Sequence, residues 1–142
     1  MKKSKLFIEP AFDFELLGLV SSVKDYKMAW AINQTLGLNL VRSEEIFIEF
    51  LSTPSLEISQ YFLSLPHGFV QLLKNKSLNS TQQLAYLIPE LKNMDYFLLV
   101  QDETEEIDVA EFARLLSRNP LIQSAVRLDV TKLKSKENLL TY

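Results

Sequence analysis

Apolar and polar positions alternate along this chain in short blocks, most of which have the length and period of β-strands. Phe14–Val20 and Tyr96–Val100 are nearly continuous apolar runs, the pattern of strands that are buried on both faces. Leu56–Leu65 and Phe69–Leu73 flank Pro66-His67-Gly68, which is typical of a hairpin turn with a left-handed glycine in a bulge. These runs predict a sheet with Tyr96–Val100 as a central strand.

Weaker runs complete the predicted sheet. Glu45–Leu51 alternates partly, and Leu84–Ile88 is a short apolar run that ends at a proline. Gln123–Asp129 alternates as a last strand. The polar stretch Asn75–Thr81 predicts a turn.

Two further segments have the period of amphipathic helices. We expect Ser22 to cap the first helix with Asp25 as its capping-box partner, and Gly37 to end it in the left-handed conformation. Asp108 is expected to cap the second helix, with Glu111 as its partner. The predicted stripes are Tyr26, Ala29, Trp30, Asn33 and Leu36 in the first helix, and Val109, Phe112, Ala113 and Leu116 in the second.

The order of these elements, β-α-β-β-β-β-β-α-β, favours an α+β fold. A run of strands between two helices is typical of a mainly antiparallel sheet and argues against a doubly wound one. We therefore predict one domain over residues 1–142, with a single sheet of about six strands and both helices packed on one face. Residues 131–142 are predicted to form a basic, weakly patterned tail.

Composition removes several kinds of chemistry. The chain has 142 residues, 47% of them apolar and 23% charged, which fits one globular domain. It has no cysteine, so disulfides, thiol nucleophiles and thiolate metal sites are excluded. His67 is the single histidine, and we interpret it as a turn residue at the hairpin tip. We assign no catalytic, cofactor-binding or metal-ligating residue.

Charge and hydropathy bear on partners and location. The net charge of −3 does not favour nucleic-acid binding. No window approaches eighteen uninterrupted apolar residues, and acidic residues interrupt any export signal near the first lysines. We therefore expect a cytoplasmic protein that does not span a membrane.

Charged residues are unevenly spread. Asp102–Asp108 holds five acids, which we interpret as solvated residues that complement a helix start, with a Ca²⁺ or Mg²⁺ site as the alternative. Glu90–Glu111 contains eight acids and one base, whereas Arg114–Lys136 contains six bases and one acid. We interpret this asymmetry as complementarity within the chain. The alternative is a basic surface for an acidic or phosphate-bearing partner.

Two segments carry a resemblance to a known family. Tyr86–Leu99 contains Ile-Pro-Glu at 88–90, followed by Met-Asp-Tyr at 94–96. This segment resembles the signature of the bacterial IPExxVDY family, with Met94 in the place of the valine. Tyr26–Asn33 is similar to the Tyr…Trp…Asn helix of that family. The resemblance implies a small bacterial cytoplasmic protein and supplies no catalytic residues.

The same two segments supply a candidate pocket. Trp30 is expected to be a core anchor, and Asn33 to hold an adjacent loop or the corner formed by Pro89–Tyr96, or to line a pocket. No nucleophile and base are recognisable as a pair. The candidate pocket residues are Tyr26, Trp30, Asn33, Glu90, Asp95 and Tyr96.

Three functional hypotheses remain open. The leading one is a non-catalytic binding or scaffold protein that acts as a homodimer, with an unidentified protein partner also possible. The second is a small enzyme whose acid and base are the carboxylates of Glu90 and Asp95. The third is an RNA- or ribonucleoprotein-associated factor that would use Arg127, Lys132, Lys134 and Lys136.

The homodimer is predicted from a comparison of areas. Two helices of this length shade about one face of a six-stranded sheet. Several strands nevertheless carry apolar residues on both faces, as Phe97 and Leu98 do. We therefore expect an uncovered apolar sheet face, which a second copy of the chain would cover.

Overall fold

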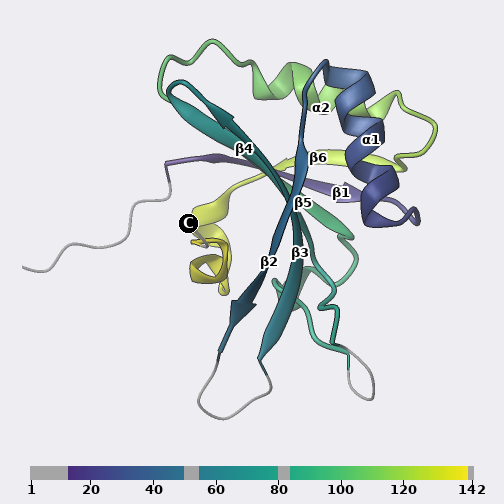
Figure 1. The fold of residues 1–142 in the computed structure, drawn as a ribbon, viewed down its shortest axis with the longest axis vertical. Helices are drawn as coiled ribbons and strands as arrows, with labels where there is room; N and C mark the ends of the chain where they lie inside the picture. Colours follow the sequence, from purple (N-terminus) through teal and green to yellow (C-terminus); the bar gives the residue numbers. More distant parts are fainter. Residues whose placement is uncertain (1–12, 50–54, 80–83, 141–142) are drawn as a thin grey trace, which may run out of the picture.

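The structure is a computed structural model that describes residues 13–49, 55–79 and 84–140. Its centre is a six-stranded antiparallel sheet with strand order β2-β3-β4-β5-β1-β6 (Figure 1). Two α-helices accompany the sheet, so the predicted α+β fold is confirmed. The elements are β1 (Glu15–Val20), α1 (Asp25–Leu36), β2 (Val41–Ile48), β3 (Leu56–Leu65), β4 (Gly68–Lys74), β5 (Tyr96–Asp102), α2 (Val109–Ser117) and β6 (Ser124–Leu128).

One run counted in the predicted order is not a strand of this sheet. Within Leu84–Ile88, Tyr86 forms a single isolated antiparallel bridge with Lys76, and the chain then turns at Pro89. Two ends of predicted segments, residues 50–51 and 80–81, lie outside the described residues.

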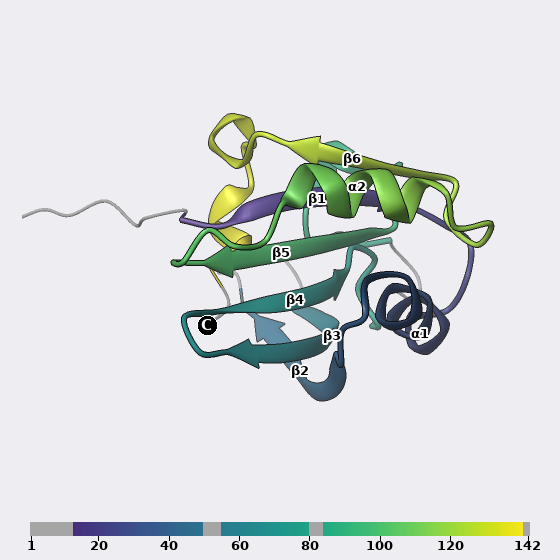
Figure 2. The same cartoon turned by 90° about the horizontal axis from the view of Figure 1, so that it is seen from above.

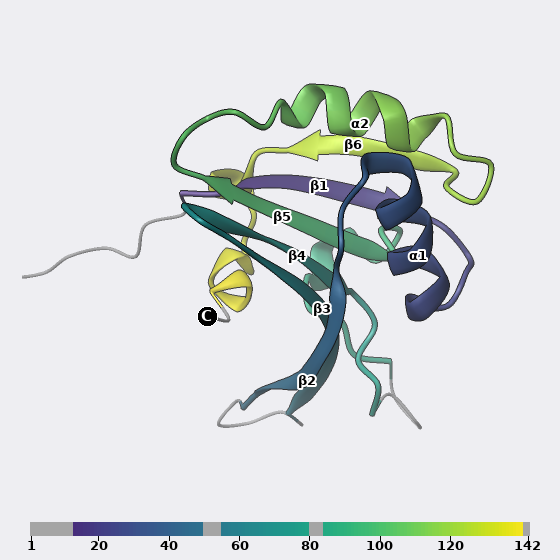
Figure 3. The same ribbon diagram turned by 45° about the horizontal axis from the view of Figure 1, so that its top comes forward.

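The two helices pack on the same face of the sheet, as predicted. Met28 and Ile32 of α1 belong to one buried cluster with Leu116 of α2. Leu17 and Leu98, on the neighbouring strands β1 and β5, complete the sheet side of that cluster. Figures 2 and 3 show both helices on this side of the strands.

The opposite face of the sheet is covered by the chain itself, so the predicted uncovered face is wrong. Phe97 and Leu99 of β5 are fully buried there, in a cluster with Leu87, Val130 and Leu139. The last two residues come from 3₁₀ turns over Val130–Lys132 and Lys136–Leu139, drawn in yellow in Figure 3. Residues 131–140 of the predicted weakly patterned tail are therefore a packed segment, whose short turns leave no helical or strand period in the sequence, and residues 141–142 lie outside the described residues.

The start of α1 differs from the prediction. Its N-cap is Lys24, which makes no side-chain capping bond, so Ser22 is not the cap. Asp25 begins the helix, and its carboxylate accepts a 2.5 Å hydrogen bond from the hydroxyl of Ser59 on β3 and lies 3.6 Å from the guanidinium of Arg42 on β2. Tertiary contacts from two strands therefore replace the local capping box.

The other predicted ends are mostly confirmed. Gly37 adopts φ 67° and ends α1, and Asp108 caps α2 by accepting a 3.3 Å bond from the N–H of Glu111. The Glu111 carboxylate bonds to Arg114 and does not complete a capping box.

Pro66 and His67 form the β3–β4 hairpin without the predicted bulge. A Cβ at Gly68 would lie 1.8 Å from the carbonyl oxygen of Gln101, so a close backbone approach requires this glycine.

Trp30 is not the expected core anchor, because 55% of it is exposed. The buried residues of α1 are Met28, Ala29, Ala31 and Ile32, which share only Ala29 with the predicted stripe, so the helix turns a different face to the sheet than the sequence indicated. Tyr26 is also exposed, at 61%. The two aromatic side chains lie on the solvent side of the helix.

Glu90 attaches the C-terminal segment to the second face. Its carboxylate oxygens accept a 2.8 Å bond from the main-chain N–H of Ser135 and a 2.9 Å bond from the hydroxyl of the same residue. Partial burial raises the pKa of Glu90, and the bonds from Ser135 and the N–H of Lys134 outweigh it, so the pKa lies below its usual value. The ionised carboxylate therefore stabilises the attachment of this segment.

Replacing Glu90 by Gln should lower the stability of the protein in a pH-dependent way. Because the folded-state pKa is depressed, the contribution of the carboxylate is fully present above the unfolded value of about 4.3 and is lost as pH falls through the folded value. Denaturant midpoints of the wild type and Glu90→Gln should thus differ at about pH 7 and converge as the pH falls through the depressed folded-state pKa. Glu137→Gln, on the same segment, is the control. A midpoint difference that does not change with pH would contradict the role assigned to the charge.

Candidate functional site

A sharp corner between residues 88 and 96 is held by one buried side chain, Asn75. The Asn75 side-chain amide donates 2.9 Å bonds to the carbonyl oxygens of Leu91 and Met94. Its side-chain oxygen accepts a 2.9 Å bond from the N–H of Ile88. The main chain of Asn75 bonds to the same region, since its N–H donates to the carbonyl of Asp95 at 3.0 Å. Asn75 is completely buried and determines the shape of the corner.

The two neighbours of Asn75 are lysines. Lys74 ends β4 and pairs across the sheet with Tyr96 of β5, whereas Lys76 bridges to Tyr86. Side chains alternate along an extended chain, so both lysines project away from the side occupied by Asn75. The hydrogen bonds of Asn75 that fix the corner thus also fix the backbone positions from which the two lysine side chains extend.

These elements enclose a cavity of about 210 Å³ that we call the lysine pocket. Four segments form its walls: the β1–α1 loop, the end of β4 with its extension, the segment of Tyr86 that bridges to Lys76, and the corner after Pro89 that leads into β5. The lining residues are Ser21, Ser22, Val23, Lys74, Lys76, Tyr86, Lys92, Met94, Asp95 and Tyr96.

The lysine pocket concentrates positive charge in a chain that is acidic overall. Lys74, Lys76 and Lys92 line it with one carboxylate, Asp95, for a net charge of +2. Among the described residues, none of these lysines lies within 4 Å of a carboxylate as an ion pair. The three ammonium groups are therefore available to an external anion.

Asp95 and Tyr96 hold the β1–α1 loop against the corner. The Asp95 carboxylate accepts a 2.8 Å bond from the N–H of Ser21. The buried hydroxyl of Tyr96 donates a 2.7 Å bond to the carbonyl of Val23. Burial raises the pKa of Tyr96, and the negative charges of Asp25 and Asp95 raise it further. This phenol stays protonated at neutral pH and serves as a fixed donor.

The structure brings together only part of the predicted candidate pocket. Asp95 and Tyr96 line the lysine pocket, while Glu90 is not among its lining residues and bonds to Ser135. Tyr26 and Trp30 lie exposed on α1. Asn33 holds the loop between α1 and β2 and not the Pro89–Tyr96 corner: its side chain donates to the carbonyl of Leu40 at 3.1 Å and accepts from the N–H of Leu40 at 2.9 Å.

The residues that dominate this site were not predicted from the sequence. Asn75 follows an apolar strand and opens a polar stretch, which predicts a turn, yet it is buried. Lys74 and Lys76 on either side of it, and Lys92 in the corner, have no motif that links them. One signal was available in the sequence: Lys-Asn-Lys stands at the end of an apolar strand. In an extended chain this order places both lysines on one side and the asparagine on the other.

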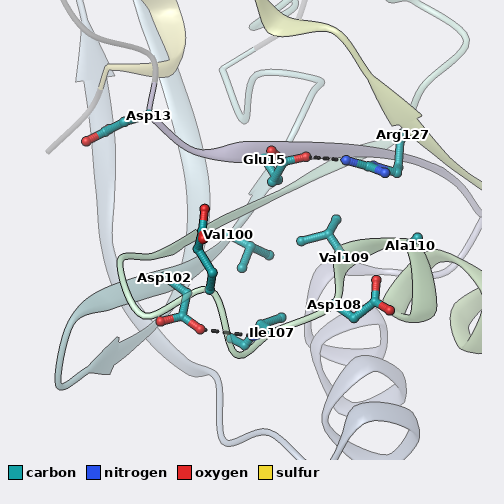
Figure 4. A pocket seen from close by; sticks show the side chains of 10 residues that line it. Asp13, Glu15, Val100, Asp102, Ile107, Asp108, Val109, Ala110 and Arg127 are labelled. Atoms are coloured by element: carbon teal, nitrogen blue, oxygen red, sulfur yellow. Dashed lines mark hydrogen bonds and ion pairs between the residues drawn. The ribbon is translucent and has the colours of Figure 1, made fainter.

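A second cavity, of about 310 Å³, lies at the other end of β5 and is acidic (Figure 4). Asp102 lines it from the end of β5 and Asp108 from the start of α2, and Glu15 pairs with Arg127 across its edge at 2.6 Å. Asp102 accepts 3.0 Å bonds from the N–H groups of Glu106 and Ile107. Hydrogen bonds from Thr104, Ile107 and Glu106 hold the pKa of Asp102 below its usual value despite partial burial.

Three carboxylates of this acidic cavity, those of Glu15, Asp102 and Asp108, already have structural roles. Asp102 shapes the loop and Asp108 caps α2, as expected for acids before a helix start. Within residues 13–49, 55–79 and 84–140, no group of three or more acidic or histidine side chains is arranged to hold a metal ion. The lysine pocket is therefore the stronger candidate site.

The comparisons give no relative for this arrangement. Neither a family model, nor a curated protein, nor a solved structure matches the chain. In the part of the chain that the structure describes, each helix is too short or too polar to cross a bilayer.

Replacing Asn75 by Ala should strongly destabilise the protein. The change removes three side-chain hydrogen bonds and leaves the carbonyl of Met94 and the N–H of Ile88 without their partner, while the carbonyl of Leu91 keeps its bond from the N–H of Met94. A buried polar group left unsatisfied costs about 1–3 kcal/mol, so we expect a loss of about 2 kcal/mol or more in the free energy of unfolding. Asn93→Ala, at an exposed position of the same corner, is the matched control. Equal denaturation midpoints for the two variants would contradict the role of Asn75.

Proposed function

We propose that this chain is a non-catalytic cytoplasmic binding protein that holds an anionic group of a ligand or partner in the lysine pocket. The observation that carries the proposal is the convergence of Lys74, Lys76 and Lys92 on one cavity without an ion-pair partner among the described residues. Unpaired cations gathered from separate segments favour recognition of a negative charge.

A binding role is favoured over catalysis by what the polar groups around the corner do. The carboxylates of Glu90 and Asp95 each bond to the main chain of another segment, Ser135 in one case and Ser21 in the other. The Tyr96 hydroxyl is similarly committed to Val23. An acid and base pair needs groups that face a shared substrate, and these side chains stabilise loops.

We also propose membership of the IPExxVDY family, because the signature-like segment has a coherent structural purpose. Pro89 begins a 3₁₀ turn, Glu90 holds the C-terminal segment, and Asp95 and Tyr96 hold the β1–α1 loop. Glu90, Asp95 and Tyr96 of the resemblance thus each stabilise a different contact of one corner. Such a signature would preserve the shape of the lysine pocket rather than a catalytic mechanism.

The binding proposal is tested by anion-dependent thermal stability. Sodium sulfate and sodium chloride are compared at equal ionic strength for the wild type and for the double variant Lys74→Gln/Lys92→Gln. A site occupied at ten times its dissociation constant contributes about 1.4 kcal/mol, or about 3–5 °C in Tm. We expect this increment in the wild type and its loss in the double variant.

The control variant is Lys132→Gln/Lys134→Gln, which removes the same charge from the C-terminal segment. Sulfate stabilises folded proteins generally by exclusion from their surface. Binding at the pocket is therefore measured by the difference between the two double variants in the sulfate-dependent increase of Tm. If both respond to sulfate as the wild type does, the proposed function is wrong.

Self-association remains a prediction, and it no longer rests on an uncovered sheet face. The exposed apolar side chains that could contribute are Tyr26 and Trp30 on α1, and Val41 and Phe47 on the edge strand β2. Light scattering across a size-exclusion peak at low micromolar concentration should give about twice the 16.4 kDa mass of one chain. A constant mass of one chain would rule out a stable dimer and leave a different protein as the partner.

A further inference from the structure

We infer that the anion bound in the lysine pocket is a phosphate monoester, a tetrahedral group that carries two negative charges near neutral pH. The inference rests on the proposed anion-binding function and adds the chemical class of the ligand. It depends on the charge of the pocket, the type of its cations and the directions from which its donors come.

The charge of the pocket matches a dianion. Lys74, Lys76 and Lys92 with Asp95 give +2, so one monoester dianion would neutralise the lining. A phosphodiester or a single carboxylate carries one negative charge and would leave the pocket positive. The Asp95 carboxylate is held by the N–H of Ser21, which fixes it as part of the wall.

The cations are ammonium groups, and no arginine is among the described residues that line the pocket. A guanidinium presents two parallel donors that match a planar carboxylate, whereas lysine binds phosphate as a point charge with donors that rotate. A set of lysines therefore adapts to the non-planar oxygens of a phosphate.

The donors come from three separate segments. Lys74 and Lys76 rise from the end of β4 and its extension, Lys92 comes from the corner, and the Ser22 hydroxyl comes from the β1–α1 loop. Neither the Ser22 nor the Tyr86 hydroxyl is engaged by another described residue. A monoester exposes three oxygens that accept hydrogen bonds, and donors on three sides can satisfy them together.

The pocket also has apolar surface for the organic part of an ester. Met94 and the ring of Tyr86 line the same cavity as the lysines. Its volume of about 210 Å³ accepts a group larger than a bare ion. The site therefore suits a small phosphorylated molecule that enters with its phosphate first.

The first experiment uses the protonation of the ligand itself. Methyl phosphate and sulfate are titrated at constant ionic strength into the ¹⁵N-labelled full chain, and binding is read from the amide shifts of Ser22 and Asp95. The second pKa of a monoester is about 6, so its dianion fraction falls about tenfold between pH 7.5 and pH 5. We expect methyl phosphate to bind about tenfold more weakly at pH 5. Sulfate stays a dianion over this pH range. Any change in its affinity between pH 7.5 and pH 5 therefore reports protonation of the protein and serves as the control.

A second set of ligands separates the monoester from other anions. Dimethyl phosphate has the charge and shape of a nucleic-acid backbone, and malonate is a dianion whose charges lie on two planar carboxylates. At pH 7.5 we expect each to bind at least about tenfold more weakly than methyl phosphate. Inorganic phosphate that binds as tightly as methyl phosphate would identify the free ion as a sufficient ligand, whereas tighter methyl phosphate supports the ester.

Variants connect the binding to the pocket. Lys76→Gln and Lys92→Gln should each weaken methyl phosphate by up to about fivefold, and Lys134→Gln should leave it unchanged. If malonate or dimethyl phosphate binds as tightly as methyl phosphate, the inference of a monoester ligand is wrong, whereas the proposed anion-binding function is retained. Tighter binding of an RNA oligonucleotide without terminal phosphates would assign the lysines to a nucleic-acid backbone and also overturn it. Absence of lysine-dependent binding for every anion would remove the proposed function as well.

Discussion

The three side-chain hydrogen bonds of Asn75 are the constraint on which the rest of this structure depends. They attach the end of β4 to a corner that has no regular secondary structure beyond one short turn. A corner of this kind exposes carbonyl and N–H groups that cannot be buried unless a partner satisfies them. Asn75 supplies both a donor and an acceptor from one position, which an apolar or charged side chain of similar size could not do.

The fixed corner has consequences on both faces of the sheet. On the helix-bearing face it places Asp95 and Tyr96 where they hold the loop before α1. On the opposite face it places Leu87 and Ile88 over β5, where Glu90 then receives the C-terminal segment. One polar interaction thus organises the covering of a sheet whose central strand is apolar on both sides. Burial of both faces explains why that strand reads as a continuous apolar run.

The fold was largely predictable because its determinants are local. Apolar runs identified the strands, and Gly37 and Asp108 marked a helix end and a helix start through backbone geometry and capping. The failures share a different origin. Ser22 does not cap the first helix, because the helix start is held by tertiary contacts of Asp25 with Ser59 and Arg42. The C-terminal turns cover the sheet although their sequence has neither a helical nor a strand period. Contacts between segments that are distant along the chain produce no regular residue spacing, so the sequence pattern does not predict them.

The candidate site was predictable only where it coincides with the corner. Asp95 and Tyr96 were identified, whereas the lysines that give the pocket its charge come from segments that the fold alone brings together. Tyr26 and Trp30 share a helical stripe with Asn33, but the helix buries the face that carries Met28 and Ile32, which the stripe did not identify.

Strand β5 connects two regions of opposite charge. Tyr96 at its start lines the lysine pocket, and Asp102 at its end lines the acidic cavity. Seven residues of extended chain separate these ends by roughly 20 Å, about two and a half Debye lengths at physiological salt. The acidic cavity is therefore too far away to neutralise the lysines through solvent. The excess of acids in the chain and a locally positive pocket can coexist, because screening confines each to its own end of the sheet.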